Sequence, residues 1–157
     1  MIEHANTIGR RSQPLIAIVD DDPADVHALK HAFKNVGDDV DFLVSDSGSD
    51  FINKLDAIYS GSDQLCPDIV FLDINMPGMT GFDTLAHLRQ QKHGKTVPII
   101  IYSTTTEKSD VEKAYELGAN CFVTKPSSLS GLRELVQRLT DFWFQSASLP
   151  SRAPVIN

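Results

Sequence analysis

The chain has 157 residues, with 21 acidic and 14 basic side chains and a formal net charge of −7. This length predicts one domain whose core needs no crosslinks. The acidic balance and the lack of a basic stripe argue against direct nucleic-acid binding, and no apolar run approaches the roughly 20 residues of a membrane span. The polar N-terminus lacks a secretion signal. The two cysteines, Cys66 and Cys121, are interpreted as small buried hydrophobes in a reduced, cytoplasmic protein.

Five short segments rich in apolar residues predict five β-strands, at residues 15–19, 40–44, 68–73, 98–102 and 121–124. Four are nearly continuous apolar runs, which is typical of parallel strands covered on both faces. The segment 40–44 alternates in polarity, so we expect it near a sheet edge.

Apolar residues at helical spacing predict a helix after each strand. The first begins with an Asp22 cap and Pro23 at the first helical position, and it ends near Gly37. The fourth ends at Gly118, and the fifth is predicted as one long helix reaching Trp143. The alternation predicts a parallel sheet with helices on both faces. We expect one domain at residues 14–145 between flexible tails, 1–13 and 146–157, and loops at residues 61–67 and 75–81.

Three of the apolar strands run directly into residues that suit a phosphate-and-metal site. The first strand ends in Asp20-Asp21-Asp22, the third in Asp73 and the fifth in Lys125-Pro126. In an open parallel sheet, ligands bind outside the carboxyl ends of the strands. We therefore expect these carboxylates and the ammonium group to meet in one crevice.

The adjacent carboxylates of Asp20 and Asp21 favour a divalent cation. Helix capping explains Asp22, but three acids in a row exceed what a cap requires, and like charges this close raise each other's pKa. A hard ion removes that conflict. Mg²⁺ fits best, because it takes oxygen ligands and is usually held by one or two carboxylates and phosphate oxygens.

Asp73 is a candidate nucleophile that would form an aspartyl-phosphate. A metal beside it would hold the incoming phosphoryl group in line, and Lys125 would add a point charge to the phosphate oxygens. Ser103 or Thr104 would donate a hydroxyl hydrogen bond. Each residue also has a structural interpretation, since Asp often ends a strand in a turn and a surface lysine is common. Pro126 fixes the backbone, and its peptide bond is a candidate for the cis form.

These residues bring a family into view: the chain resembles the receiver domains of two-component response regulators, over about residues 14 to 143. The segments that carry the resemblance are Ile18-Val-Asp-Asp-Asp-Pro23, Asp68-Ile-Val-Phe-Leu-Asp-Ile-Asn-Met-Pro-Gly-Met-Thr-Gly81, Pro98-Ile-Ile-Ile-Tyr-Ser103 and Gly118-Ala-Asn-Cys-Phe-Val-Thr-Lys-Pro126. The resemblance implies a doubly wound, flavodoxin-like α/β fold with strand order 2-1-3-4-5. It also implies a stand-alone regulator in a phosphorelay.

The resemblance assigns a role to each site residue. Asp73 would be the phosphoacceptor, Ser103 the switch hydroxyl, Lys125 the phosphate contact and Phe122 the aromatic switch residue. The implied ligands of Mg²⁺ (or Mn²⁺) are Asp21, Asp73, the backbone carbonyl of Asn75 and, through a bound water, Asp20. A sensor histidine kinase or a histidine phosphotransfer protein would donate the phosphoryl group.

Two positions depart from the usual receiver pattern. Ser127 follows Lys125-Pro126 where the family often has Phe, and Thr104 stands where Ala is more usual. Because Thr is bulkier than Ala beside the phosphate, Thr104 is expected to slow the attacking water and to alter the phosphoryl lifetime.

Phosphorylation is expected to signal through the face formed by the fourth helix, the fifth strand and the fifth helix, which is also a candidate homodimer surface. Only about a dozen residues follow Gln145, so we expect no output domain and output by protein contact. Phe142, Trp143 and Phe144 cannot all face one way. The alternatives are a helix end folded over the core with one stray aromatic, or an exposed partner surface.

Two other functions compete with a phosphoryl-accepting signalling module. A phosphatase of the haloacid dehalogenase type also uses a strand-end Asp, Mg²⁺ and a Lys, with the nucleophile on the first strand and a second Asp two residues later. The position two residues after Asp73 is Asn75, and Asp22, two residues after Asp20, lacks the Gly-Thr expected to follow it. A receiver-like scaffold that never takes phosphate would not need the full set of acids and Lys125. We therefore expect no turnover as an enzyme beyond slow autodephosphorylation.

Overall fold

The computed structural model describes residues 13–37, 39–61 and 66–150 of the chain. These residues form a five-stranded sheet in which every pair of neighbouring strands runs parallel. The strand order is β2-β1-β3-β4-β5, so the doubly wound α/β fold and its strand order are confirmed. The strands are β1 (Leu15–Val19), β2 (Asp41–Ser45), β3 (Ile69–Leu72), β4 (Ile99–Ser103) and β5 (Cys121–Thr124).

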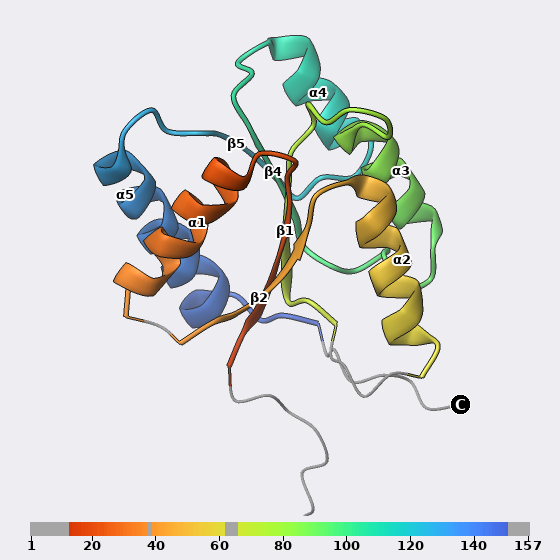
Figure 1. Cartoon of the computed structure of the whole chain (residues 1–157), viewed down its shortest axis with the longest axis horizontal. Helices are drawn as coiled ribbons and strands as arrows, with labels where there is room; N and C mark the ends of the chain where they lie inside the picture. The colour runs from red at the N-terminus through yellow and green to blue at the C-terminus, as the bar shows by residue number, and fades with distance from the viewer. Residues whose placement is uncertain (1–12, 38, 62–65, 151–157) are drawn as a thin grey trace, which may run out of the picture.

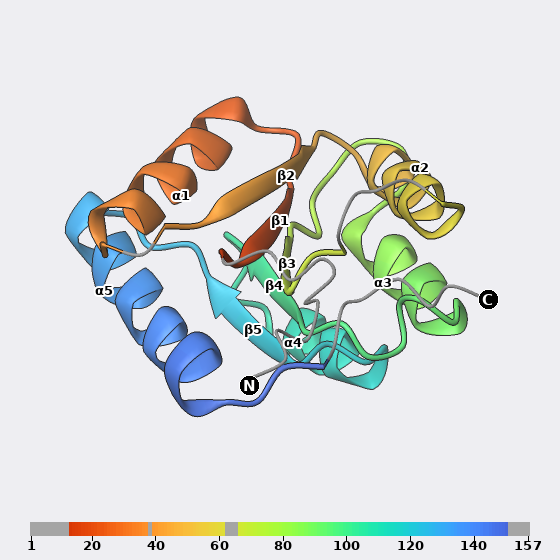
Figure 2. The ribbon, with the colours of Figure 1, turned by 90° about the horizontal axis from the view of Figure 1, so that it is seen from below.

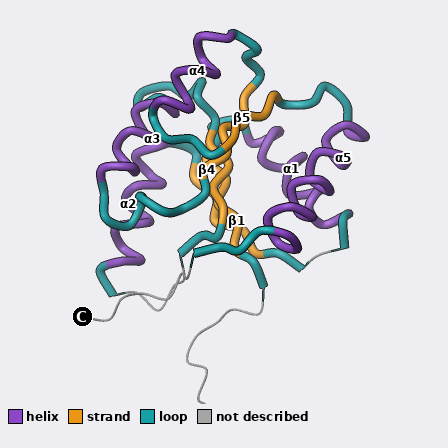
Figure 3. Tube along the Cα trace, turned by 180° about the vertical axis from the view of Figure 1, so that it is seen from behind, coloured by secondary structure: helices purple, strands orange, loops and turns teal. Residues whose placement is uncertain are grey.

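A helix follows each strand, and the helices cover both faces of the sheet. They are α1 (Pro23–Asn35), α2 (Gly48–Tyr59), α3 (Gly81–Gln90), α4 (Lys108–Glu116) and α5 (Leu129–Thr140). Figure 1 shows α1 and α5 on one side of the sheet and α2, α3 and α4 on the other. The view from below in Figure 2 shows the same three layers, and the tube in Figure 3 shows the strands running between them.

Each face of the sheet buries its own apolar cluster. Ala17 and Val19 of β1 pack in the cluster under α2, α3 and α4, whereas Ile16 and Ile18 pack in the cluster under α1 and α5. Successive side chains of a strand point to opposite faces, so a strand covered on both sides must be apolar at every position. This explains why β1 and β3 are continuous apolar runs, why β4 is one as far as Tyr102, and why β2, at the sheet edge, is only partly buried.

Three strands differ slightly from the predicted boundaries, because backbone pairing rather than hydrophobicity sets them. β2 begins at Asp41 instead of residue 40, since it pairs with β1 from Leu15 onward. β3 loses both predicted terminal aspartates, and β4 starts one residue later but extends to Ser103, which pairs with Thr124. The caps agree with the prediction for α1: Asp22 accepts a hydrogen bond from the backbone of Ala24.

The prediction of one long C-terminal helix is wrong. The α-helix α5 ends at Thr140, and a π-helical segment, η1 (Asp141–Ser146), follows it. In this segment the consecutive residues Trp143 and Phe144 both pack against the cluster under α1 and α5, while Phe142 is left 54% exposed. The aromatic run therefore mostly covers the core and leaves one ring in solvent.

Several other expectations can be compared with the described residues. The Lys125–Pro126 bond is trans, because no described peptide bond is cis. Cys66 is buried in one apolar cluster and Cys121 packs against the other. Leu149, in the expected C-terminal tail, packs against the cluster under α1 and α5. Residues 1–12, 62–65 and 151–157 lie outside the described part of the chain. Within that part, no helix is long and apolar enough to span a membrane.

Gly81 allows α3 to start directly against the end of β3. Its N–H donates to the carbonyl of Ile74, 3.1 Å away, and a Cβ at this position would overlap the backbone carbonyl of Asp73 and the Cα of Ile74. The backbone that carries Asp73 and the first turn of α3 thus touch without room for a side chain.

We expect Gly81→Ala to lower the free energy of unfolding by about 1–3 kcal/mol, because the added methyl group must push the backbone apart. Urea unfolding measures the loss. Gln90→Ala, at an exposed position at the end of the same helix, is the control and should change stability by under about 0.5 kcal/mol. Equal stability of the two variants would contradict the packing argument.

Candidate functional site

The register of the parallel sheet brings the predicted site residues to one edge. Val19 pairs with Leu72, so Asp20 and Asp73, the residues that follow, lie side by side. The two strands remain joined there, since the N–H of Asp73 donates to the carbonyl of Val19 at 3.0 Å. On the other side, the N–H of Lys125 donates to the carbonyl of Ser103 at 2.8 Å.

Three of the expected ligands gather into one acidic group. Carboxylate oxygens of Asp20, Asp21 and Asp73 lie within 4.8 Å of one another, and no other described residues form such a group of three metal-ligating side chains. Asp20 and Asp73 are buried, whereas Asp21 is exposed. Hard oxygen ligands at this spacing, open to water on one side, fit Mg²⁺ or Mn²⁺.

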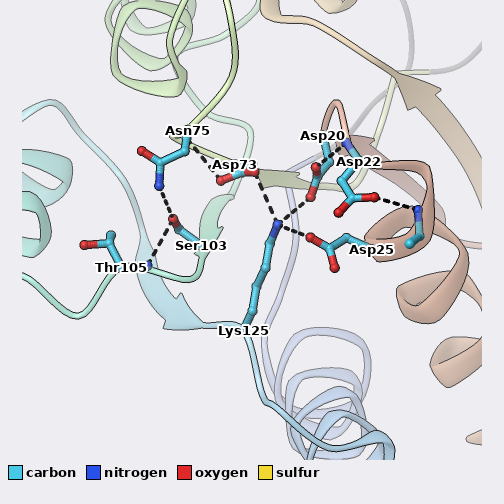
Figure 4. A network of polar contacts seen from close by, with 9 residues as sticks. Asp20, Asp22, Asp25, Asp73, Asn75, Ser103, Thr105 and Lys125 are labelled. Carbon is cyan, nitrogen blue, oxygen red and sulfur yellow. Dashed lines mark hydrogen bonds and ion pairs between the residues drawn. The ribbon is translucent and has the colours of Figure 1, made fainter.

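Lys125 lies at the centre of the site and contacts three carboxylates (Figure 4). Its Nζ lies 2.8 Å from Asp20 Oδ2, 2.7 Å from Asp25 Oδ2 and 3.2 Å from Asp73 Oδ2. The lysine side chain is 7% exposed. The ring centroid of the buried Tyr102 lies 5.4 Å from Nζ.

Burial and charge act against each other on these groups. Burial raises the pKa of Asp20, and the hydrogen bonds from Lys125 and from the backbone of Asp22 only partly offset it. Burial alone would lower the pKa of Lys125, but the hydrogen bonds to Asp20 and Asp25 outweigh it and raise that pKa. Burial also raises the pKa of Tyr102 to about 12, which keeps the phenol neutral. Lys125 therefore remains protonated. Its single positive charge is the only one in contact with the buried carboxylates of Asp20 and Asp73 among the ion pairs of the described residues.

Ser103 is fully buried at the end of β4 and faces the Asp73 loop. The side-chain amide of Asn75 donates to its Oγ at 3.4 Å, and the N–H of Asn75 donates to Asp73 Oδ1 at 3.2 Å. The N–H of Thr105 also points to Ser103 Oγ, at 3.5 Å, while the Thr105 hydroxyl bonds Asp110 in the first turn of α4. Ser103 thus connects the Asp73 loop to the start of α4.

The remaining predicted residues lie around this centre. Phe122 is half-buried on β5 and packs against the cluster under α2, α3 and α4. Thr104 is exposed directly after Ser103, and Ser127 is exposed after Pro126. The structure therefore brings together Asp20, Asp21, Asp73, Asn75, Ser103 and Lys125, and leaves Phe122 beside them on the α4 side of the sheet.

Sequence reasoning missed two contacts. Asp25, in the first turn of α1, binds Lys125, yet an acid at that position looks like an ordinary helix-start residue. Tyr115 of α4 accepts a hydrogen bond at its hydroxyl from the N–H of Phe122, at 3.2 Å, on the open edge of β5. Neither contact leaves a local sequence signal, because the partners come from different elements.

The chain matches a known protein family over the region that contains this site. The family model for the response regulator receiver domain matches residues 16–137. The chain belongs to the response regulator receiver family. The match contains Asp20, Asp73, Ser103 and Lys125. This receiver domain therefore belongs to two-component signalling, which favours a signalling module over a phosphatase.

Relatives of the receiver domain support this assignment. Response regulator Rcp1 of Synechocystis sp. is 28% identical over 137 residues, covering 87% of this chain and 93% of the relative. The structure of the phosphorylated cyanobacterial phytochrome response regulator RcpA has a TM-score of 0.80 and 28% identity, covering 89% of this chain and all of that one. The Mn²⁺-bound form of Rcp1 has a TM-score of 0.74 and 26% identity, covering 88% and 99%.

The raised pKa of Asp20 predicts a pH-dependent stability of the metal-free receiver domain. The folded state holds the Asp20 proton more tightly than the unfolded chain, so this group stabilises most below its ordinary value of 3.8 and loses that contribution as pH rises. In chelator at pH 7, Asp20→Asn should therefore melt above wild type, with each kcal/mol gained worth about 2–4 °C.

Thermal unfolding at pH 7 and near pH 3.5 tests this expectation. The advantage of Asp20→Asn should shrink at the lower pH, which lies below the ordinary pKa of 3.8, so that Asp20 is mostly protonated in both states. Asp22→Asn is the control, because Asp22 is exposed and Asn caps a helix as well as Asp. An advantage that stays constant with pH would show that ionisation of Asp20 is not its cause.

Proposed function

We propose that this receiver domain accepts a phosphoryl group on Asp73, with Mg²⁺ bound, from a sensor histidine kinase or a histidine phosphotransfer protein. The single observation that carries the proposal is the position of Asp73. Its buried carboxylate belongs to the metal-ligand group and also contacts the ammonium of Lys125. A nucleophile, a cation site and a phosphate contact within one crevice are the components of phosphoryl transfer.

The transfer needs no further reactant. A carboxylate oxygen of Asp73 attacks the phosphorus of the donor phosphohistidine, a P–O bond forms, and the P–N bond breaks with its electron pair passing to the imidazole. Lys125 stays protonated throughout, since its pKa is raised, and it offers a hydrogen to a phosphoryl oxygen. Ser103 offers its hydroxyl to another oxygen from the end of β4.

The metal ligands are proposed to be Asp21, Asp73 and the backbone carbonyl of Asn75, with Asp20 acting through a bound water. When bound, Mg²⁺ would neutralise charge on the phosphoryl oxygens and hold the group in line. The donor set supports this assignment, because three carboxylates face one point. A structural relative described as Mn²⁺-bound supports a divalent ion at this site, and another described as phosphorylated supports the proposed phosphorylation.

The proposed output is a shift of the α4-β5-α5 face. Phosphate would draw Ser103 and Lys125 inward, the loop after Ser103 would follow, and Phe122 would turn into the space. The Thr105 contact with α4 and the Tyr115 contact with Phe122 support this route, because they join the moving parts. We propose a cytoplasmic domain at residues 14–145 between tails, with this face binding a downstream protein or a second copy.

We expect acetyl phosphate or a phosphoramidate with Mg²⁺ to add one phosphoryl group to the wild-type protein. Intact-mass spectrometry detects the gain, and Asp73→Asn or added chelator should abolish it. Asp68→Asn, at the other end of β3, is the matched control and should still be phosphorylated. Wild-type protein that gains no mass with any donor would overturn the proposed function.

Thr104 is proposed to set the phosphoryl lifetime. Its side chain is exposed directly after the buried Ser103, and the attacking water is proposed to approach past it. We expect Thr104→Ala to speed loss of the phosphoryl group severalfold, because the smaller side chain opens that approach, and Thr106→Ala to leave the rate unchanged. The decay of the phosphorylated mass after donor removal measures both rates. Slower decay in Thr104→Ala would refute the role.

A further inference from the structure

We propose that Asp25 is a positioning residue that holds Lys125 on the α1 side of the site and competes with the phosphoryl group of Asp73 for its ammonium. The inference rests on the proposed phosphorylation of Asp73. Asp25 lies outside the four sequence segments that carry the family resemblance, and it is not among the acids that can hold the metal.

The contact with Asp25 is the shortest of the three that Lys125 makes. The Nζ–Oδ2 distance is 2.7 Å, compared with 2.8 Å to Asp20 and 3.2 Å to Asp73. Figure 4 shows Asp25 reaching the lysine from α1, on the side away from Ser103. Helix-dipole stabilisation explains an acid in the first turn of α1, but it does not require this carboxylate to bind a lysine 100 residues away.

All three hydrogens of the Lys125 ammonium group are used in hydrogen bonds. An ammonium group carries three hydrogens, and three carboxylates accept from Lys125. A phosphoryl group on Asp73 would bring three further acceptor oxygens to the same place. Asp20 and Asp25 keep their charge when Asp73 is phosphorylated, so their contacts with Lys125 compete with these oxygens for the hydrogens of the ammonium group.

Of the two carboxylates that keep their charge, Asp25 is the partner that Lys125 can release more easily. Phosphorylation converts the Asp73 carboxylate to an aspartyl-phosphate and passes its charge to the phosphoryl oxygens, so the contact of Lys125 with Asp73 is replaced rather than lost. The side chain of Asp20 is 3% exposed, so losing the lysine there would leave a buried charge unpaired unless the metal takes its place. The side chain of Asp25 is 38% exposed, so water can replace the lysine there. The strength of the Asp25 contact therefore sets how readily Lys125 reaches the phosphoryl group.

The test measures binding of beryllofluoride, a phosphoryl analogue, in the presence of Mg²⁺. Asp25→Asn should bind it about two- to fivefold more tightly than wild type, the range that corresponds to losing a competing, partly exposed ion pair. Asp22→Asn is the matched control, because it removes an exposed charge from the same helix start, keeps the cap and touches no lysine hydrogen. It should leave the affinity nearly unchanged.

A second readout reports the contact itself. The NMR resonances of the Lys125 side-chain CH₂–NH₃⁺ group in the unliganded protein should shift in Asp25→Asn and stay in place in Asp22→Asn. Beryllofluoride should then change these resonances less in Asp25→Asn than in wild type, because the lysine has no α1 contact left to lose.

Two results would overturn the inference while leaving the proposed function intact. The first is equal tightening in both variants, which would mean that net charge alone matters. The second is unchanged or weaker beryllofluoride binding in Asp25→Asn, which would mean that Asp25 does not compete for the lysine. A wild-type protein that binds no beryllofluoride would instead refute the proposed phosphorylation of Asp73.

Discussion

One ammonium group contacts three carboxylates at the carboxyl end of the sheet. The negative charge of these acids exceeds the positive charge of the lysine, and the other features of the site depend on this excess. Lys125 is buried and bonds Asp20, Asp25 and Asp73, while Asp21 adds a further negative charge nearby. One cation cannot neutralise four acids, so the site retains a net attraction for a hard divalent ion. The same lysine also ties β1, β3, β5 and α1 together at one point.

The register of the parallel strands places the carboxylates and Lys125 at the same edge of the sheet. Val19 pairs with Leu72 and Ser103 with Thr124, so the residues that follow the strands emerge together at one edge. A slip of one residue would turn the side chains of a strand to the opposite face. The burial of both faces opposes such a slip, because each strand supplies side chains to both apolar clusters. Packing of the two apolar clusters therefore fixes the strand register, and the register fixes the relative positions of the site residues.

The residues of this receiver domain fall into two groups: those that form the site at the strand ends, and those that surround it. The acids and Lys125 follow the ends of β1, β3 and β5, whereas Thr104 and Ser127 lie in loops and Asp25 lies in the first turn of α1. Variation at such positions can alter metal affinity, phosphoryl lifetime or partner choice without disturbing the fold. The contacts of Thr105 and Tyr115 give α4 two hydrogen-bonded links, one to the Ser103 loop and one to β5.

The sequence by itself determined the alternation of strands and helices, the order of functional residues along the chain and, through the family resemblance, the strand order. Burial on both faces leaves continuous apolar runs, and strand-end residues of a parallel sheet must converge, so both features can be read locally. Only the tertiary structure decided the one-residue shifts of β2 and β4, the π-helical turn that seats Trp143 and Phe144, and the binding of Asp25 to Lys125. These depend on contacts between distant segments, and a carboxylate in the first turn of a helix has the same local pattern whether it faces water or a lysine 100 residues away.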